Sequence, residues 1–413
     1  MPEQPNVVIV GASLAGAKAA EALREQGFAG SIVLVGDETV RPYERPPLSK
    51  EYLQGKAEQN TIFVHDPDWY AGHDVDLRLG TAVNAIDRGR HDVVLADGER
   101  IPYDKLLLAT GASPRRLPVP GAETDGVLYL RRLEDSDRIR ETLGRVSRLA
   151  IIGAGWIGLE VAAAARIADV QVTVVEIAAQ PLLAVLGPQI APVFAGLHRE
   201  HGVDLRLGVG VDEITGRDGA VTGLQLADGE HVDAEAVLIG VGAAPNTQLA
   251  ADAGLAVSDG IVVDASLRTS DPDIYAAGDV ALAYHPLIGK HIRVEHWANA
   301  LNQPATAAAA MLGHEDAQYT TLPYFYTDQY DLGMEYTGYV EPDGYDDVVV
   351  RGDLGTREFI AFWLHEGRVL AGMNVNIWDV TDPIQDLIRS GKQIDIARLA
   401  DPNVPLPDVA GAP

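Results

Sequence analysis

Two glycine-rich segments, each preceded by an apolar run, constrain this chain more than any other feature. The first follows Val7–Val10 and has glycine at positions 11 and 16, while the second follows Leu149–Ile152 and has glycine at 153, 155 and 158. A buried parallel strand is a continuous apolar run, and a glycine-rich turn that leads into a helix is the fingerprint of a dinucleotide-binding βαβ unit. Two such fingerprints predict two bound dinucleotides and electron transfer between them.

The first fingerprint departs from the full pattern at one position, where Ser13 replaces the second glycine. Serine is small and can donate a hydrogen bond, so we expect the pyrophosphate site at the helix N-terminus to survive. The next predicted strand, Ser31–Val35, runs toward Asp37, which we expect to accept hydrogen bonds from a ribose, with Glu38 as the alternative. The residues predicted to contact the cofactor at this turn are Gly11, Ser13, Leu14, Ala15 and Gly16.

The second fingerprint satisfies the complete G-x-G-x-x-G spacing. An alanine-rich helix is predicted over Leu159–Ile167, and the following strand, Val172–Val175, ends at Glu176. A carboxylate there accepts from both ribose hydroxyls and repels the additional phosphate of NADP, so we predict NADH over NADPH. Each fingerprint is followed later in the chain by an apolar run and a glycine turn: the run at 106–108 after the first, and the run at 237–239, which leads to Gly242, after the second. Each of these two segments either closes a nucleotide-binding lobe or is an ordinary core strand and turn. The residues predicted to contact this second dinucleotide are Gly153, Gly155, Ile157, Gly158, Glu176 and Gly242.

Composition excludes several classes of function. The chain has no cysteine, which rules out disulfide chemistry of the glutathione-reductase type and any mechanism through a cysteine sulfenate. A formal net charge of −28 opposes binding to nucleic acid and to acidic membranes. There is no apolar run near the roughly 20 residues of a membrane span and no basic leader, so we expect a cytoplasmic protein. His198 and His201 lie three apart without a further ligand cluster, so we predict no metal site.

The segment Arg41–Lys50, together with the two fingerprints and Ala277–Asp279, resembles the NADH-dependent ferredoxin reductases of oxygenase systems, in the pyridine nucleotide-disulfide oxidoreductase superfamily. The resemblance runs from about residue 5 to about residue 400. It implies FAD at the first fingerprint and NAD at the second. It also implies an α/β fold of glutathione-reductase-like layout, with two Rossmann-like domains and a C-terminal α+β interface domain.

The resemblance also assigns roles to individual side chains. It implies that Lys50 lies near the flavin ring, where a cation favours the anionic reduced form, and that Glu160 and Glu295 border the nicotinamide. These three are the predicted catalytic residues. The alternatives are a solvated Lys50, an ordinary helix-face Glu160, a surface Arg131, a helix-capping Asp279, and core aromatics at Trp297 and Tyr326. The side chains implied to contact FAD are Ala15, Asp37, Lys50, Val83, Arg131, Asp279, Trp297 and, where the family often has tryptophan, Tyr326.

The order of the motifs predicts an interrupted first domain. We place FAD binding at 1–112 and 246–320, NAD binding at 113–245, and the C-terminal domain at 321–413. In the last domain, strands are predicted at 346–350, 359–364 and 368–372. A helix is expected to follow, with Asp382 as its N-cap, Pro383 as its first residue and Gly391 at its end. Glu335 stands where some relatives carry a basic residue.

These expectations combine into one predicted function, an FAD-dependent NADH:ferredoxin oxidoreductase. Electrons would pass from NADH through FAD to an iron–sulfur ferredoxin, of the [2Fe–2S] or another type, which feeds an oxygenase such as a haem-thiolate cytochrome monooxygenase. A monomer or weak dimer is expected. The alternatives are an NADH:quinone or dye reductase, and an NADH redox sensor resembling apoptosis-inducing factor. The candidate docking groups for an acidic ferredoxin are Arg115–Arg116, Arg131–Arg132, and Arg389 with Lys392.

Overall fold

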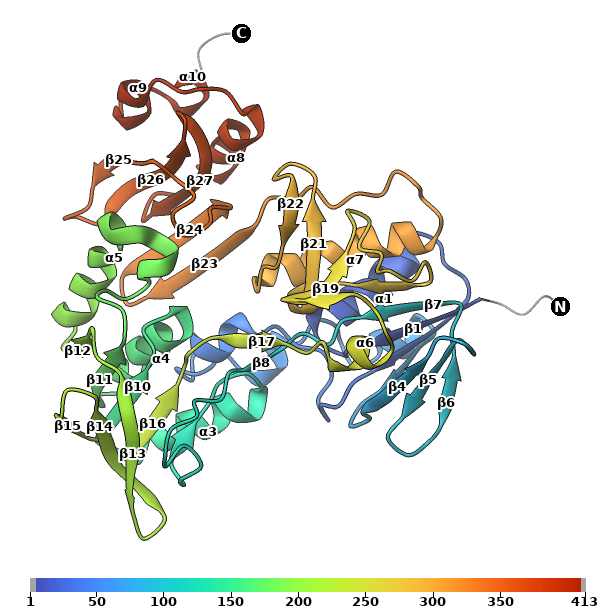
Figure 1. Ribbon diagram of the computed structural model, residues 1–413, viewed down its shortest axis with the longest axis horizontal. Coiled ribbons are helices and arrows are strands. Elements are labelled where there is room, and N and C mark those ends of the chain that lie inside the picture. The colour runs from blue at the N-terminus through green and yellow to red at the C-terminus, as the bar shows by residue number, and fades with distance from the viewer. Residues whose placement is uncertain (1–4, 410–413) are drawn as a thin grey trace. The chain divides into compact units, whose positions relative to one another are not determined.

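The computed structural model describes residues 5–409, which form two compact units, each built from discontinuous stretches of chain. The first unit contains residues 5–44, Gln59–Ser113 and Ala244–Pro323. The second unit contains Arg45–Glu58, Pro114–Ala243 and residues 324–409. Figure 1 labels many of the elements of both units along the chain. The division into three domains stays a prediction.

A five-stranded parallel sheet, in the order β20-β7-β1-β2-β3, forms the centre of the first unit. Its central strand, β1, is a continuous apolar run that is buried on both faces, as the sequence predicts. Helices α1 and α7 pack against each other beside this sheet (Figure 1). The bounds are β1 Asn6–Val10, α1 Leu14–Glu25, β2 Ser31–Val35, β3 Val75–Arg78, β7 Lys105–Leu108, β20 Ile274–Ala276 and α7 Trp297–Met311.

Smaller antiparallel elements complete the first unit. They are the three-stranded sheet of β4 Val83–Asp87, β5 Asp92–Leu95 and β6 Arg100–Pro102, and a four-stranded sheet of β18 Val257–Ser258, β19 Gly260–Val263, β21 Ala281–His285 and β22 Lys290–Ile292, in which β19 and β21 are parallel. Short helical turns are η2 Gln59–Ile62, α2 Trp69–Gly72, α6 Gln248–Asp252 and η3 Gly278–Val280. Strands β8 Ala112–Pro114 and β17 Ala243–Pro245, where the chain passes from one unit to the other, form a two-stranded ribbon.

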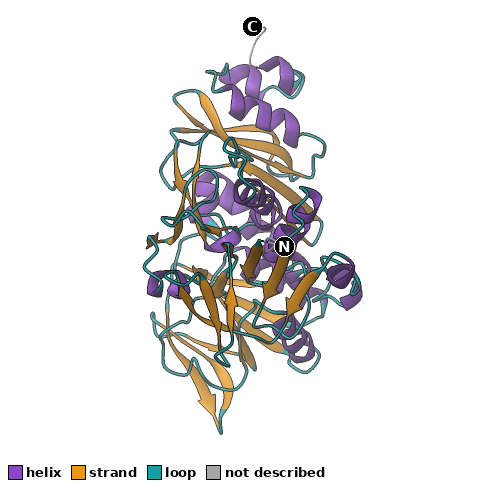
Figure 2. Cartoon of the chain, turned by 90° about the vertical axis from the view of Figure 1, so that its right-hand side faces the viewer, coloured by secondary structure: helices purple, strands orange, loops and turns teal. Residues whose placement is uncertain are grey.

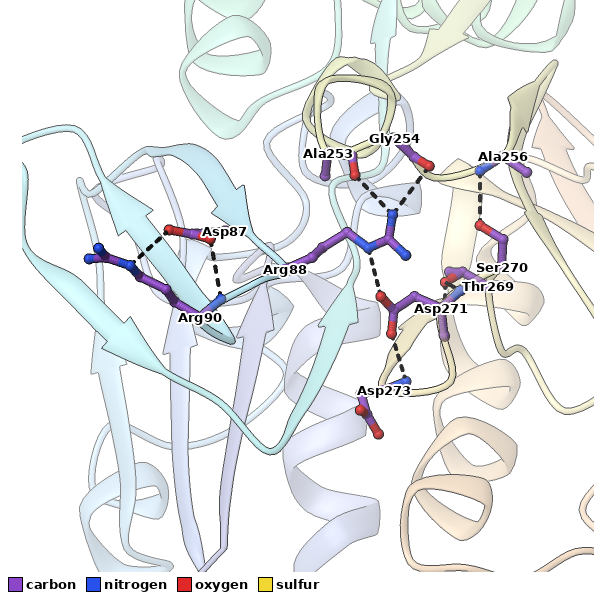
Figure 3. Close-up of polar contacts among 10 residues, drawn as sticks. All are labelled: Asp87, Arg88, Arg90, Ala253, Gly254, Ala256, Thr269, Ser270, Asp271 and Asp273. Carbon is purple, nitrogen blue, oxygen red and sulfur yellow. Dashed lines mark hydrogen bonds and ion pairs between the residues drawn. The ribbon is translucent and has the colours of Figure 1, made fainter.

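A polar cluster fixes the segment that leads into β20 (Figure 3). Arg88 donates from Nε to Asp271 Oδ2 at 2.6 Å and from Nη1 to the carbonyl of Ala253 at 3.2 Å. The other oxygen of Asp271 accepts from the backbone N–H of Asp273. Burial raises the pKa of Asp271, but the hydrogen bonds from Asp273 and Arg88 outweigh this and hold it below its ordinary value. The strand that ends before Gly278 therefore has a fixed starting point.

Within the described residues, the second unit has three sheets. The first is parallel, in the order β12-β11-β10-β16-β9, and the apolar residues of its inner strands β10 and β16 are buried. A three-stranded antiparallel sheet, β13-β14-β15, packs its apolar side chains in the same core. The bounds are η1 Pro46–Ser49, β9 Val127–Leu128, α3 Leu133–Leu143, β10 Arg148–Ile152, α4 Trp156–Ile167, β11 Gln171–Glu176, α5 Leu183–Glu200, β12 Asp204–Leu207, β13 Val211–Arg217, β14 Ala220–Leu226, β15 His231–Asp233 and β16 Ala236–Ile239.

The third sheet of the second unit is antiparallel, in the order β23-β24-β27-β26-β25, and it confirms the strands predicted in the C-terminal third. Figure 2 shows the short helices near the C-terminal end that follow it. The bounds are β23 Tyr324–Gln329, β24 Leu332–Gly338, β25 Asp347–Asp353, β26 Glu358–His365, β27 Arg368–Val375, α8 Thr381–Ser390, α9 Ile396–Ala400 and α10 Leu406–Val409.

Two predicted helix starts are wrong. Helix α8 has Val380 as its N-cap, so Asp382 and Pro383 both lie inside its first turn, where a proline is tolerated because the N–H groups have no intrahelical partner. Gly391, with φ of 57°, ends this helix as predicted. Helix α4 begins three residues before Leu159, because the fingerprint residues themselves form its first turn.

Candidate active site

The turn of the first fingerprint requires glycine at two positions. Gly11 has φ of +117°, and a Cβ there would lie 2.1 Å from the carbonyl oxygen of Ala109. A Cβ on Gly16 would lie 2.0 Å from the carbonyl oxygen of Gly11. Ser13, by contrast, has φ of −120°, which any residue adopts, so the departure from glycine costs the backbone nothing. Helix α1 begins at Leu14, directly after this serine.

The acidic pair after β2 separates into two environments. Glu38 accepts a hydrogen bond from the Tyr43 hydroxyl through Oε2. Asp37 is exposed at the end of the strand. Asp37 therefore stays the predicted ribose ligand, while Glu38 has a structural contact.

The Gly-Asp segment lies against the first fingerprint. A Cβ on Gly278, whose φ is +79°, would lie 3.2 Å from the Cβ of Ala15, and its N–H donates to Gln303 Oε1 of α7 at 2.8 Å. Asp279 follows in η3 and leads into strand β21, so its alternative as the cap of a following helix is wrong. The start of α1 and Asp279 are thus neighbours, as a shared ligand would require.

Three other features of the first unit concern the implied flavin contacts. Burial lowers the pKa of His296 to about 4, although the carboxylate of Asp279 acts in the opposite direction. Trp297 begins α7 and Val83 begins β4, and both side chains are half-buried. Glu295 is exposed and forms an ion pair with Arg293. The roles of Trp297, Val83 and Glu295 toward the cofactors stay predictions.

The second fingerprint repeats the backbone of the first. Gly153 has φ of +101°, and a Cβ there would lie 2.4 Å from the carbonyl oxygen of Gly240. Gly158 would bring a Cβ within 2.2 Å of the Gly153 carbonyl oxygen. Gly155 is the N-cap of α4, and no atom lies within 4 Å of the position where its Cβ would be. This open space at a helix N-terminus fits a pyrophosphate, and the exposed Ile157 lies on the first turn beside it.

Glu176, the last residue of β11, forms a hydrogen bond with the turn of the second fingerprint. Its Oε2 accepts from the backbone N–H of Ala154 at 2.7 Å, and its Oε1 accepts from that of Ala178 at 2.9 Å. Each carboxylate oxygen can accept a second hydrogen bond, so the half-buried side chain remains suited to ribose hydroxyls. Gly242, with φ of +96°, lies exposed near Arg115.

A buried charge cluster in the second unit brings together two of the predicted catalytic residues. Lys50, which follows η1, places Nζ 2.9 Å from Glu160 Oε1, and the two side chains are only 8% and 4% exposed. The alternatives of a solvated Lys50 and an ordinary helix-face Glu160 are therefore wrong. Glu160 also accepts from Ser49 Oγ at 2.5 Å and from Thr327 Oγ1 at 2.6 Å. Three donors compensate one buried carboxylate.

A buried ion pair is weak evidence for a stabilising role, because the free-energy cost of removing two charges from water often leaves the pair no more stabilising than packed apolar side chains of similar volume. Because Glu160 lies on α4, the helix that follows the second fingerprint, we interpret the cluster as functional. The ring of Tyr326, half-buried on β23, lies 5.4 Å from Lys50 Nζ and gives the cation a further partner.

Arg131 and Glu335 have defined contacts. The backbone N–H of Arg131 donates to Asp135 Oδ2 at 3.0 Å, and its carbonyl accepts from Arg45 at 2.5 Å, while its side chain is half-buried. Glu335 accepts from Tyr324, Asn374 and Thr381, so it anchors the C-terminal sheet. The predicted docking groups Arg115–Arg116 and Arg389 with Lys392 are exposed, and Arg132 is half-buried.

Sequence reasoning missed Ser49, Thr327 and Gln329. Ser49 adjoins Lys50 in the Arg41–Lys50 segment, and Thr327 adjoins Tyr326. Their position next to predicted site residues was the signal that could have identified them.

Over residues 5–409, no group of three or more metal-ligating side chains is placed to hold a metal ion. No helix in that range is long and apolar enough to cross a membrane.

Comparisons with known proteins identify the fold. Residues 5–304 match the pyridine nucleotide-disulphide oxidoreductase family, and residues 324–410 match the reductase C-terminal family. Putidaredoxin reductase of Pseudomonas putida is 41% identical over 100% of this chain and 98% of its own length. Rhodocoxin reductase of Rhodococcus erythropolis is 41% identical over 90% of this chain and 86% of its own. The crystal structure of a covalent putidaredoxin reductase–putidaredoxin complex matches with a TM-score of 0.94 at 41% identity, covering 98% of this chain and 97% of that one. The predicted α/β fold of the pyridine nucleotide-disulphide oxidoreductase type is confirmed, and its C-terminal part matches the reductase C-terminal family.

Proposed function

The chain belongs to the pyridine nucleotide-disulphide oxidoreductase family, and we propose that it is an FAD-dependent NADH:ferredoxin reductase. The observation that carries this proposal is the full-length similarity to putidaredoxin reductase, which extends through the C-terminal domain. The family uses FAD and NAD(H), and this chain has one glycine-rich turn suited to each. FAD, when bound, supplies the conversion of a two-electron hydride transfer into single-electron steps.

The residues of this chain bind and orient the two dinucleotides. The N-termini of α1 and α4 offer free backbone N–H groups and a positive dipole end to a pyrophosphate. Asp37 and Glu176 accept from the ribose hydroxyls of their respective nucleotides. Lys50, held by Glu160, provides a fixed buried cation at the flavin, which stabilises negative charge on the reduced ring.

Glu176 makes the nucleotide preference testable. Its carboxylate repels the 2′-phosphate of NADPH, and no arginine follows it directly. Steady-state oxidation of NADH is expected to exceed that of NADPH, and Glu176→Gln, which keeps an acceptor for Ala154 or Ala178, is expected to narrow the ratio. An unchanged ratio would remove Glu176 from nucleotide selection.

The acceptor is tested by comparing electron acceptors in the same assay. A [2Fe–2S] ferredoxin is expected to accelerate NADH oxidation and to show saturation as its concentration rises. Rapid turnover with quinones and no gain from ferredoxin would instead favour the quinone reductase alternative. A monomer or weak dimer and a cytoplasmic location are further proposals, which sedimentation and cell fractionation would test.

A further inference from the structure

A buried histidine lies at one end of a hydrogen-bond chain in the second unit. His198, near the end of α5, is fully buried, and its Nε2 lies 2.8 Å from Gln329 Oε1 on β23. Its Nδ1 has no hydrogen-bond partner within residues 5–409. Burial lowers the pKa of His198 to about 4, so the ring is neutral near pH 7. None of the steps described above uses this histidine.

The direction of each hydrogen bond in the chain follows from its atoms. An amide oxygen only accepts, so the neutral ring of His198 must carry its proton on Nε2. Gln329 Nε2 then donates to Thr327 Oγ1 at 3.2 Å. The Thr327 hydroxyl, having accepted, donates to Glu160 Oε1 at 2.6 Å. Every donor therefore points from His198 toward the carboxylate that holds Lys50.

We propose that His198, Gln329 and Thr327 are positioning residues whose one-way hydrogen-bond chain orients the Glu160 carboxylate so that it holds the Lys50 ammonium in one place. The inference rests on the proposed function only for the role of Lys50 at the flavin. Successive hydrogen bonds in a buried chain polarise one another, so the last bond to the carboxylate is strengthened by those before it.

The alternative of a purely packing role fits the cluster poorly. A packing role alone would be served better by an apolar side chain than by His198, whose buried Nδ1 has no hydrogen-bond partner. The carboxyl of Asp328, next to Thr327 on β23, interacts electrostatically with Lys50, Glu160, Glu51 and Glu335. Lys50 is the one cation among them, so its position depends on how the carboxylates around it are held.

Thr327 supplies a matched pair of variants. Thr327→Val keeps the shape of the side chain but removes the hydroxyl, whereas Thr327→Ser keeps the hydroxyl. The control, Thr222→Val, makes the same exchange on β14, away from the hydrogen-bond chain. We expect Thr327→Val to slow the limiting rate of anaerobic flavin reduction by NADH about tenfold, without changing the affinity for NADH. Its flavin midpoint potential should become more negative. Thr327→Ser should restore both quantities, and Thr222→Val should change neither.

The tautomer of His198 gives a readout that does not depend on turnover. In ¹⁵N spectra of the holoprotein, with the signal assigned by its loss in His198→Phe, we expect the Nε2–H tautomer from about pH 6 to pH 8. In Gln329→Leu this preference should be lost. An Nδ1–H tautomer in the unsubstituted protein would overturn the proposal, as would a Thr327→Val variant that matches the Thr222→Val control. Neither the flavin measurements nor the tautomer measurement uses ferredoxin. If ferredoxin proved not to be the electron acceptor, both would still test the role of His198, Gln329 and Thr327.

Discussion

The two glycine-rich turns share one backbone but differ in the side chain two residues after their last glycine. In the first, this residue is Lys18, which is 26% exposed and pairs with Glu21 on the same helix. In the second it is Glu160, which is 4% exposed and held by Lys50, Ser49 and Thr327. The two turns have similar backbones, which we expect to bind nucleotides, whereas the helix position two residues beyond the last glycine is partly exposed in the first and buried in the second.

Replacing the first glycine of either turn should produce the largest effect, because a Cβ would meet a backbone carbonyl and φ is positive. We expect Gly11→Ala to lose bound FAD, and Gly153→Ala to keep FAD but lose reduction by NADH. Flavin content and anaerobic bleaching measure the two outcomes separately. If Gly153→Ala released FAD while Gly11→Ala retained it, the assignment of the two turns would be reversed.

The buried position of Glu160 and the partly exposed position of Lys18 should respond very differently to substitution. Glu160→Ala leaves Lys50 buried without its counter-charge, so we expect the free energy of unfolding to fall by about 3–5 kcal/mol. Lys18→Ala removes a partly exposed pair within one helix, worth about 0–1 kcal/mol. Urea unfolding of both variants provides the measurement. Equal losses would show that the burial of Glu160 has no special energetic consequence.

Acid should weaken the second unit through His198. Its folded pKa of about 4 lies below the ordinary value, so between these two values the unfolded chain binds a proton that the folded chain does not, and stability falls as the pH decreases. The loss is expected to reach about 3 kcal/mol between pH 7 and pH 4. His198→Phe should flatten this pH dependence, whereas His201→Phe should leave it in place. Unfolding curves at several pH values would show whether the two variants differ.

The smallest effects should come from exchanging the middle residues of the turns. Ser13→Gly changes a residue whose backbone already suits any side chain, so we expect FAD affinity to change less than about threefold. Gly155→Ser should fold normally, because its backbone and its surroundings admit a side chain, but should weaken NADH binding about tenfold by occupying the pyrophosphate space. Fluorescence titrations measure both affinities, and a larger effect at Ser13 than at Gly155 would contradict this view of the turns.

The sequence predicts the strands and turns well because their causes are local. An apolar run beside Gly11 or Gly153 needs no distant residue to be recognised, and Gly391 ends its helix through its own left-handed conformation. The start of α8 was missed because Asp382 and Pro383 form an equally plausible N-terminus two residues later.

The charge cluster depends on distant residues and was only partly predictable. Ser49 and Thr327 lie 111 and 167 residues from Glu160 in the sequence, and a glutamate within a helix gives no local sign that it will be buried. The family resemblance supplied Lys50 and Glu160. It did not supply Gln329 or His198, which are joined by a hydrogen bond between β23 and α5.

Double-mixing stopped-flow spectroscopy tests the central claim that electrons pass from NADH at one turn, through FAD at the other, to an iron–sulfur partner. The holoprotein is first mixed anaerobically with NADH and then with oxidised ferredoxin. We expect rapid bleaching of the flavin followed by rapid reoxidation as the ferredoxin is reduced. Slow bleaching with a persistent charge-transfer band, or a bleached flavin that ferredoxin does not reoxidise, would contradict the account.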